Sequence, residues 1–218
     1  MPVYGVPFSR VPLDLPGLFG RTAPTILEIG FGMGDTTAEI AAASPDRDFL
    51  AVDVHTPGVG ALLKLVQARG LTNIRIVEHD AREVVDFQLP DNCLTGIHVF
   101  FPDPWPKARH HKRRLIQTQF VDKLATKLSP GGYLHLATDW PDYADQMQDA
   151  VESIASLRRL PATALRPAET AAGLSAGRGA WRPAQRPTTR FEQRGLALGH
   201  PIVDIVAIRK DDPARVTA

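Results

Sequence analysis

Apolar positions along the chain gather in short runs, and the stretches between these runs have helical spacing. The first run is TILEI at 25–29, and a later stretch spaces Val59, Leu62, Leu63 and Val66 as on one face of a helix. Short apolar runs are typical of buried strands, and a spacing of three or four is typical of amphipathic helices. The predicted strands are 25–29, 49–54, 74–77, 96–101, 133–138 and 202–208, and the predicted helices are 35–43, 58–69, 115–128 and 143–156.

Strands and helices that alternate in this order predict an α/β fold. Crossovers between parallel strands are right-handed and place helices on both faces of a mostly parallel sheet. A length of 218 residues fits one domain spanning 1–218. The alternation stops after residue 156, and residues 166–187 are rich in Pro, Gly, Ala and Arg, which predicts a flexible loop there.

Composition excludes several classes of protein. Hydrophobic residues make up 44% and charged residues 22% of the chain, as in ordinary soluble domains. No apolar stretch approaches the eighteen or so residues of a membrane helix, and the N-terminus has no signal-peptide pattern, so we expect a cytoplasmic protein without a membrane partner. The single cysteine, Cys93, excludes an internal disulfide framework and a cysteine-based zinc site. Adjacent His110 and His111 diverge, so no metal is expected.

Charge is distributed unevenly along the chain. Residues 1–156 carry 14 Lys and Arg against 19 Asp and Glu, whereas residues 157–218 carry 11 against 5. The basic C-terminal part could hold phosphates locally, although a solvated Arg-rich surface would give the same count.

A glycine turn follows the first predicted strand. Gly30, Gly32 and Gly34 allow a sharp turn and the close approach of a ligand, although a tight turn alone would also use glycines. A dinucleotide fingerprint would place Gly or Ala where this chain has Asp35. A carboxylate in the first turn of the helix repels a pyrophosphate but tolerates an ammonium or sulfonium group, as in S-adenosylmethionine.

Acidic residues stand at the ends of the first three predicted strands. Glu28 lies just before the glycine turn, Asp53 is placed to accept from ribose hydroxyls, and Asp80 is placed to accept from an adenine amino group. Each acid alone is also explained as a helix cap or a surface charge. Because ligands of open α/β sheets bind at the carboxyl ends of the strands, the set predicts a cofactor pocket over Glu28–Gly34, Asp53 and Asp80.

The segment FFPDPWPKARHHKRRL at 100–115 continues the fourth predicted strand. Its three prolines stiffen the backbone around Asp103 and Trp105. A rigid acid beside an indole suits a flat heteroaromatic substrate, because the indole stacks on a base and the carboxylate accepts from its N–H groups. A proline-rich loop with a packed tryptophan is the structural alternative.

Cations and polar residues near the same edge point to a phosphate-bearing substrate. Five cations in eight residues predict phosphate contacts: Lys107, Arg109, Lys112, Arg113 and Arg114. Two further groups of residues reach this edge by loops. They are Asp139, after the fifth predicted strand, and Thr189, Arg190, Phe191 and Glu192, before the last one. A helix cap or a turn would also explain either acid alone.

Taken in order, these motifs resemble the bacterial tRNA (guanine-N7)-methyltransferases. The matching segments are LEIGFGMG at 27–34, VDVHTPGVG at 52–60, HDA at 79–81, FFPDPWPKARHHKRRL at 100–115, TDW at 138–140 and RPTTRFEQRG at 186–195. The resemblance implies a Rossmann-like class I methyltransferase fold whose seven-stranded sheet has an antiparallel last strand. It also implies S-adenosylmethionine as cofactor, guanine N7 in the tRNA variable loop as target, and 7-methylguanosine as product.

The resemblance also implies roles for individual residues. Asp103 would be the catalytic position. The cofactor would contact Glu28, Gly30, Gly32, Gly34, Asp53, Asp80 and Asp103, and the substrate would contact Lys107, Asp139 and Thr189–Glu192. Many members carry a basic extension before the first strand, whereas here that strand begins at Thr25. Part of the tRNA-binding surface is therefore expected to be either missing or supplied by the C-terminal arginines.

Three other functions fit parts of the pattern. A methyltransferase acting on an exocyclic base amine would use a similar Asp-Pro-aromatic loop after its fourth strand. An NAD-dependent oxidoreductase is disfavoured by Asp35, and a non-enzymatic RNA-binding module would leave the acids around the glycine turn without a role. The sequence does not distinguish a monomer from a homodimer.

Overall fold

The structure is a computed structural model that describes residues 4–161 and 187–211, without the side chains of Arg190 and Phe191. Its strands are β1 (Thr25–Ile29), β2 (Asp48–Asp53), β3 (Ile74–Glu78), β4 (Leu94–Phe100), β5 (Leu128–Thr138), β6 (Leu157–Arg159) and β7 (Val203–Arg209). Its helices are α1 (Leu15–Phe19), α2 (Asp35–Ala43), α3 (Thr56–Arg69), α4 (Ala81–Glu83), α5 (Thr118–Lys127), α6 (Pro141–Glu152) and α7 (Arg190–Ala197). A π turn at Val84–Gln88 continues α4, and a 3-10 helix spans Ala108–Arg113.

All seven strands form one sheet in the order β3-β2-β1-β4-β5-β7-β6. Strand β7 runs antiparallel to β5 and β6, and the pairs among β1 to β5 are parallel. This topology confirms the predicted fold, including the antiparallel last strand. The strand order reverses between β1 and β4, and open α/β sheets bind ligands beyond the carboxyl ends of the strands at such a reversal.

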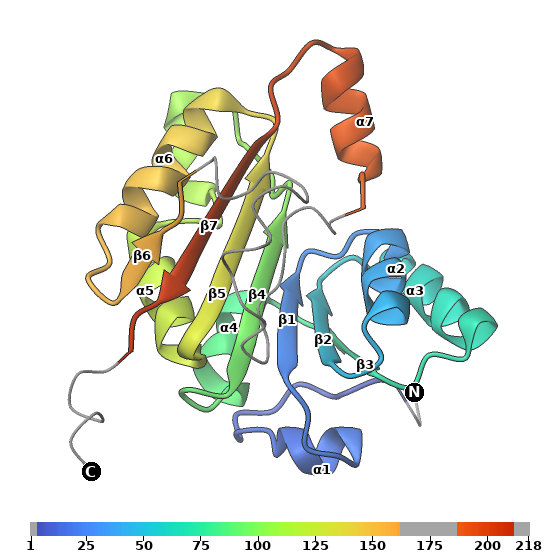
Figure 1. Cartoon of the computed structure of the whole chain (residues 1–218). Coiled ribbons are helices and arrows are strands. Elements are labelled where there is room, and N and C mark those ends of the chain that lie inside the picture. The colour runs from blue at the N-terminus through green and yellow to red at the C-terminus, as the bar shows by residue number, and fades with distance from the viewer. Residues whose placement is uncertain (1–3, 162–186, 212–218) are drawn as a thin grey trace, which may run out of the picture.

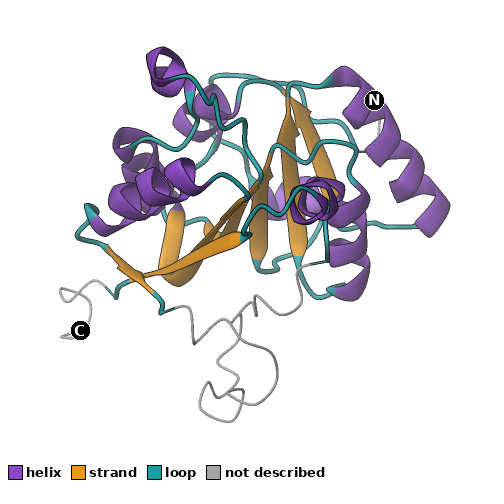
Figure 2. Ribbon diagram, turned by 90° about the horizontal axis from the view of Figure 1, so that it is seen from above, coloured by secondary structure: helices purple, strands orange, loops and turns teal. Residues whose placement is uncertain are grey.

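Helices cover the sheet on both sides, with α2 and α3 on one face and α5 and α6 on the other (Figures 1 and 2). Strand β1 is buried along its whole length, as expected for a central parallel strand. Its Ile26 packs in the core beneath α2 and α3, whereas Leu27 and Ile29 pack in the opposite core. Glu28 takes the next position on the Ile26 face, so an acid interrupts an otherwise apolar strand.

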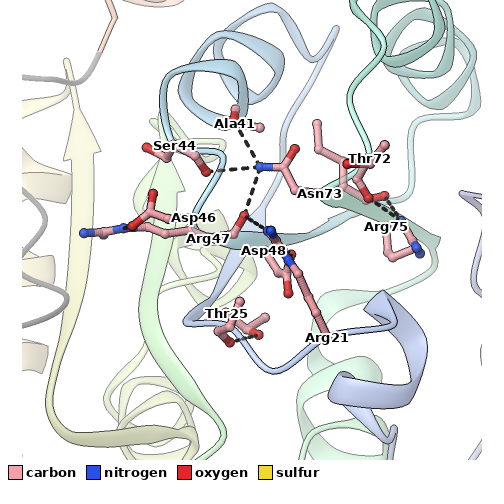
Figure 3. A network of polar contacts seen from close by, with 12 residues as sticks. Arg21, Thr25, Ala41, Ser44, Asp46, Arg47, Asp48, Thr72, Asn73 and Arg75 are labelled. Atoms are coloured by element: carbon pink, nitrogen blue, oxygen red, sulfur yellow. Dashed lines mark hydrogen bonds and ion pairs between the residues drawn. The ribbon is translucent and has the colours of Figure 1, made fainter.

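A polar network closes the amino-terminal edge of the sheet (Figure 3). Nε and Nη2 of Arg21 donate to Oδ1 of Asp48 at 2.9 and 2.7 Å. The Asn73 amide nitrogen donates to three backbone carbonyls between residues 41 and 47, at 2.9–3.2 Å. The network therefore ties the end of α2 to the starts of β2 and β3.

The N-terminal segment lies beside β3. Gly5 forms a parallel bridge with Ile76, whose amide donates to the Tyr4 carbonyl and whose carbonyl accepts from the Val6 amide, both at 2.8 Å. The Phe8 ring then stacks on His79 with 3.7 Å between centroids. The sequence did not predict this pairing, because it joins residues about seventy positions apart.

The structure corrects several predicted boundaries. Helix α5 begins at Thr118 rather than Leu115, because the 3-10 helix and an extended segment come first. Helices α1, α4 and α7 and the short strand β6 were not predicted. The predicted loop at 166–187 lies outside the described residues except for Pro187. Within the described ranges, every helix is too short or too polar to cross a membrane.

Candidate active site

The glycine turn between β1 and α2 has left-handed backbone at alternate positions. Gly30, Gly32 and Gly34 have φ of 77°, 58° and 79°, a region that favours glycine. A Cβ added at Gly30 or Gly32 would meet nothing within 4 Å, whereas one at Gly34 would come within 2.7 Å of Leu62. Backbone conformation therefore explains the first two glycines, and close packing adds a reason for the third.

Asp53 braces the glycine turn from the end of β2. Its Oδ2 accepts from the Gly32 amide at 2.8 Å, and its Oδ1 accepts from the His55 amide at 2.9 Å. The turn also touches the start of α3, where a Cβ on Gly58 would lie 1.9 Å from the Gly32 carbonyl oxygen. A carboxylate has about four acceptor sites, so Asp53 keeps capacity for ligand hydroxyl groups.

Glu28 is a buried carboxyl group beneath this turn. The Glu28 residue is 3% exposed, and its Oε2 has no hydrogen-bond partner among the described residues. Burial raises the pKa of Glu28 to about 7, the nearby Thr37 hydroxyl opposes that rise, and the Asp53 charge adds to it. Burying a polar oxygen without a partner is costly, so the site favours a ligand that brings a cation or a donor.

Asp80 follows β3 at the same edge. It is exposed, and its Oδ1 accepts from the Arg82 amide at 2.7 Å as the N-cap of α4. The carboxyl groups predicted to surround the cofactor therefore lie at the carboxyl ends of β1, β2 and β3. In the part of the chain that is described, His, Cys, Asp and Glu side chains form no cluster that could hold a metal ion.

The Asp103 segment leaves β4 with strained backbone. Phe101 and Trp105 have φ of 51° and 43°, which non-glycine residues rarely adopt. Asp103 between them is exposed. The Trp105 indole is half-buried, with the Arg113 guanidinium 5.0 Å from its centroid and the His110 ring edge-on at 5.9 Å. The acid and the indole thus project from one stiff bend, as the prolines predicted.

Four of the five predicted phosphate-binding cations are exposed beside this bend: Lys107, Arg109, Lys112 and Arg113. Arg114 was predicted to bind phosphate with them, and that prediction is wrong. Its side chain is 1% exposed, and its guanidinium donates to the Pro104 carbonyl, Gln146 and Asp142. The backbone becomes extended at Arg114 as the 3-10 helix ends, which turns this side chain inward.

Asp139 follows β5 and packs against α7. Its Oδ2 lies 3.4 Å from Nδ1 of His200, and a Cβ on Gly195 would come within 2.9 Å of the same oxygen. Figure 1 shows α7 at the end of the molecule toward which the parallel strands point. The structure therefore brings the last predicted substrate-binding segment to the edge that carries Asp139.

Thr189 and Glu192 begin α7 as a capping box. The Glu192 amide donates to Oγ1 of Thr189 at 3.0 Å, and the Thr189 amide donates to the Glu192 carboxylate at 3.4 Å. The spacing Thr-x-x-Glu is typical of a helix start, and of the two interpretations of Glu192 given above, a substrate contact or a cap, the structure shows the cap. The side chains of Arg190 and Phe191, predicted to lie with them, are outside the description.

Comparisons with known proteins agree with this geometry. Residues 22–205 match a family model described as "Putative methyltransferase". The tRNA (guanine-N(7)-)-methyltransferase of Nitrosospira multiformis is 54% identical over 96% of this chain and 85% of its own length. The protein of the same name from Nitrosomonas eutropha is 54% identical over 94% and 85%.

Among solved structures, the antibiotic-resistance methyltransferase Kmr matches with a TM-score of 0.56, covering 95% of each chain at 19% identity. At that identity the match shows the shared class I methyltransferase fold alone. The family model and the two relatives show more, because all three cover most of the chain and the relatives are 54% identical to it. The chain belongs to the tRNA (guanine-N(7)-)-methyltransferase family.

Proposed function

We propose that this protein transfers a methyl group from S-adenosylmethionine to N7 of a guanine in the variable loop of tRNA, forming 7-methylguanosine. One juxtaposition carries the proposal. The glycine turn lies above the buried Glu28, which has one oxygen without a partner among the described residues, and the exposed Asp103 lies on the bend at the same carboxyl edge of the sheet. The relatives named for this reaction, more than half identical to the chain, support the assignment.

The residues around the glycine turn fit the proposed cofactor. Gly30 and Gly32 leave open space beside their α-carbons, and Glu28 offers a carboxylate oxygen with no partner in the described chain. Asp53 and Asp80 add negative charge at the adjacent strand ends, which favours a cationic ligand over a pyrophosphate. S-adenosylmethionine would supply an electrophilic methyl group at this edge.

The exposed cations beside the bend fit an RNA substrate. Lys107, Arg109, Lys112 and Arg113 can contact phosphates, which position an RNA without reading its sequence. Asp139 and the N-terminal turn of α7 would contact the same substrate from the far side of β5. Trp105 would shield the target base, although Arg113 already lies over one part of its ring.

Orientation is the main task of the chain's own residues. Guanine N7 carries an unprotonated lone pair at neutral pH, so no general base is needed to create the nucleophile. Well-oriented reacting pairs gain on the order of 7–11 kcal/mol over free encounter. We propose that Asp103 orients the guanine by accepting from its Watson–Crick N–H groups. Its charge would also offset the positive charge that develops on the imidazole ring.

Incubation with unmodified tRNA and labelled S-adenosylmethionine tests this proposal. We expect label in 7-methylguanosine, mapped to one position of the variable loop by cleavage at the modified base. Label on an exocyclic amine would instead support the alternative suggested by the Asp103-Pro104-Trp105 bend. Absence of label, with the cofactor shown to bind, would overturn the assignment of tRNA as substrate.

A further inference from the structure

Arg114 is the one cation of the basic segment whose side chain points into the protein. Its Nε donates to the Pro104 carbonyl at 2.8 Å, and its Nη1 donates to Oε1 of Gln146 at 2.8 Å. Its Nη2 donates to Oδ2 of Asp142 and lies 3.0 Å from Nε2 of His111. A single buried guanidinium therefore links the bend after β4 to helix α6.

The same residue also reaches the loop after β3. The Arg114 carbonyl accepts from Nη2 of Arg82 at 3.3 Å, and Arg82 lies in the helix that Asp80 caps. The Arg114 guanidinium lies 4.8 Å from the centroid of the Tyr143 ring on α6. Arg114 thus contacts segments that follow β3, β4 and β5, the three strands that lead into Asp80, Asp103 and Asp139.

The bend after β4 needs such a contact because its backbone is strained. Left-handed conformation at a non-glycine residue costs about 1–3 kcal/mol and persists only where surrounding contacts impose it. Phe101 and Trp105, at the two ends of the bend, both have this conformation. The Phe101 amide donates to the Ala137 carbonyl at 2.8 Å, which fixes the first end. The bond from Arg114 to Pro104 fixes the second, between Asp103 and Trp105.

Arginine suits this position and lysine does not. A guanidinium is planar and presents donors in fixed directions, so it can bond the Pro104 carbonyl and two side chains of α6 at once. An ammonium on a flexible stem would satisfy them less completely. The exposed Asp142 balances the buried charge, and the Arg114 guanidinium lowers the pKa of that carboxyl.

We propose that Arg114 is a positioning residue for methyl transfer, holding the Pro104 carbonyl so that Asp103 and Trp105 keep the orientation that the target base requires. The proposal rests on the proposed function. It predicts that loss of Arg114 lowers the rate of methyl transfer at saturating substrate and does not lower the affinity for tRNA.

The test compares Arg114→Lys with Arg159→Lys, a control at an exposed arginine paired with Glu152 at the far edge of the sheet. Single-turnover transfer is measured with saturating tRNA and S-adenosylmethionine, and both dissociation constants are measured separately. We expect Arg114→Lys to slow transfer by about 30-fold. This is the effect of losing one to two hydrogen bonds that hold the bend in the orientation the transition state requires. Both dissociation constants should stay within about 3-fold, and the control should match the wild type.

A spectroscopic readout follows the bend directly. The chain has three tryptophans, so 5-fluorotryptophan gives three fluorine signals, and the Trp105 signal is assigned by its loss in Trp105→Phe. We expect Arg114→Lys to shift or broaden the Trp105 signal and to leave the other two unchanged. If wild-type protein methylates no tRNA, the proposed function fails, and this readout still tests whether Arg114 holds the bend.

Two results would overturn the proposal. One is a wild-type transfer rate in folded Arg114→Lys. The other is an equal loss of rate and of both affinities, which would indicate a general structural role. If Arg114→Lys does not fold, Asp142→Ala takes its place, because Asp142 is exposed and its loss removes one acceptor of the Arg114 guanidinium without opening the core. A wild-type rate in Asp142→Ala would then overturn the proposal.

Discussion

Buried carboxyl groups at the amino-terminal and carboxyl edges of the sheet differ in their hydrogen-bond partners. At the amino-terminal edge, Asp48 is 1% exposed and takes two hydrogen bonds from Arg21. At the carboxyl edge, Glu28 is 3% exposed and keeps one oxygen without a partner among the described residues. The first arrangement satisfies the charge within the protein. The second leaves it unsatisfied where a ligand is expected, which reduces stability and preserves binding capacity.

The backbone follows the same contrast. Asn73 joins three carbonyls at the amino-terminal edge with one side chain. At the carboxyl edge, the glycine turn and the Asp103 bend both use left-handed backbone, and the bend does so at non-glycine residues. Two of the three left-handed non-glycine residues in the described chain therefore lie where the reaction is proposed, and the third, Asn92 before β4, is of a type that tolerates this conformation. Changes at the two edges should separate turnover from stability.

The largest effect is expected at the bend. Asp103→Asn removes the charge and one acceptor from an exposed side chain, so we expect turnover to fall by about 10²–10³-fold. The melting temperature and the affinity for S-adenosylmethionine should change little. Single-turnover kinetics measure turnover, thermal denaturation measures the melting temperature, and equilibrium dialysis measures the affinity. The control is Asp122→Asn, at an exposed position of α5. Wild-type turnover in Asp103→Asn would remove this residue from the mechanism.

Glu28→Gln should weaken cofactor binding and stabilise the apoprotein. Folding raises the pKa of Glu28 from 4.5 to about 7, so ionisation of this group destabilises the folded state progressively between those values. The neutral variant should therefore gain about 3 kcal/mol in unfolding free energy at pH 8 and almost nothing at pH 4. We expect cofactor affinity to fall about 10–100-fold. Urea denaturation at both pH values and calorimetric titration give the two results, and equal gains at both pH values would contradict the assigned ionisation.

Arg21→Ala should produce the opposite result. It leaves the Asp48 carboxylate buried without its cation, and because the Arg21 side chain is 41% exposed, we expect a loss of about 2 kcal/mol in unfolding free energy. Methyl transfer at a temperature where the variant is folded should equal that of the wild type. Arg158→Ala, at an exposed position of β6, is the matched control. A reduced rate in folded Arg21→Ala would show that the two edges are coupled.

The smallest effect is expected at the exposed cations. Lys112→Ala and Arg109→Ala should each reduce the salt dependence of tRNA binding by about one in the slope of log affinity against log salt concentration. Lys127→Ala, at the amino-terminal edge beside Asp91, should leave that slope unchanged. Filter binding at several salt concentrations measures all three slopes. Equal slopes in every variant would place the tRNA elsewhere on the surface.

Local signals in the sequence predicted most of the fold. The glycine turn and the helices that flank β2 depend on contacts within a few residues, so periodicity was sufficient to find them. The start of helix α7 was also predictable, because the spacing of Thr189 and Glu192 is that of a capping box. The pairing of Gly5 with Ile76 was not, because it depends on a distant segment.

Among the charged residues of the candidate site, some positions were predictable from the sequence and one was not. The acids at the strand ends were predictable because parallel strands bring their carboxyl ends together. Arg114 was not distinguished from Arg113, because side-chain direction there depends on where a 3-10 helix ends. Residue type alone does not show which of two adjacent arginines will be buried.

The approach of Gly58 to the glycine turn has one further consequence. A methyl group on Gly58 would lie 1.9 Å from the Gly32 carbonyl oxygen, so even alanine requires one of two backbones to move. A substitution at Gly58 is therefore tolerated only if the backbone of the glycine turn moves with it. A mutational scan should therefore find position 58 intolerant of every side chain, and second-site revertants should map to the 30–34 turn.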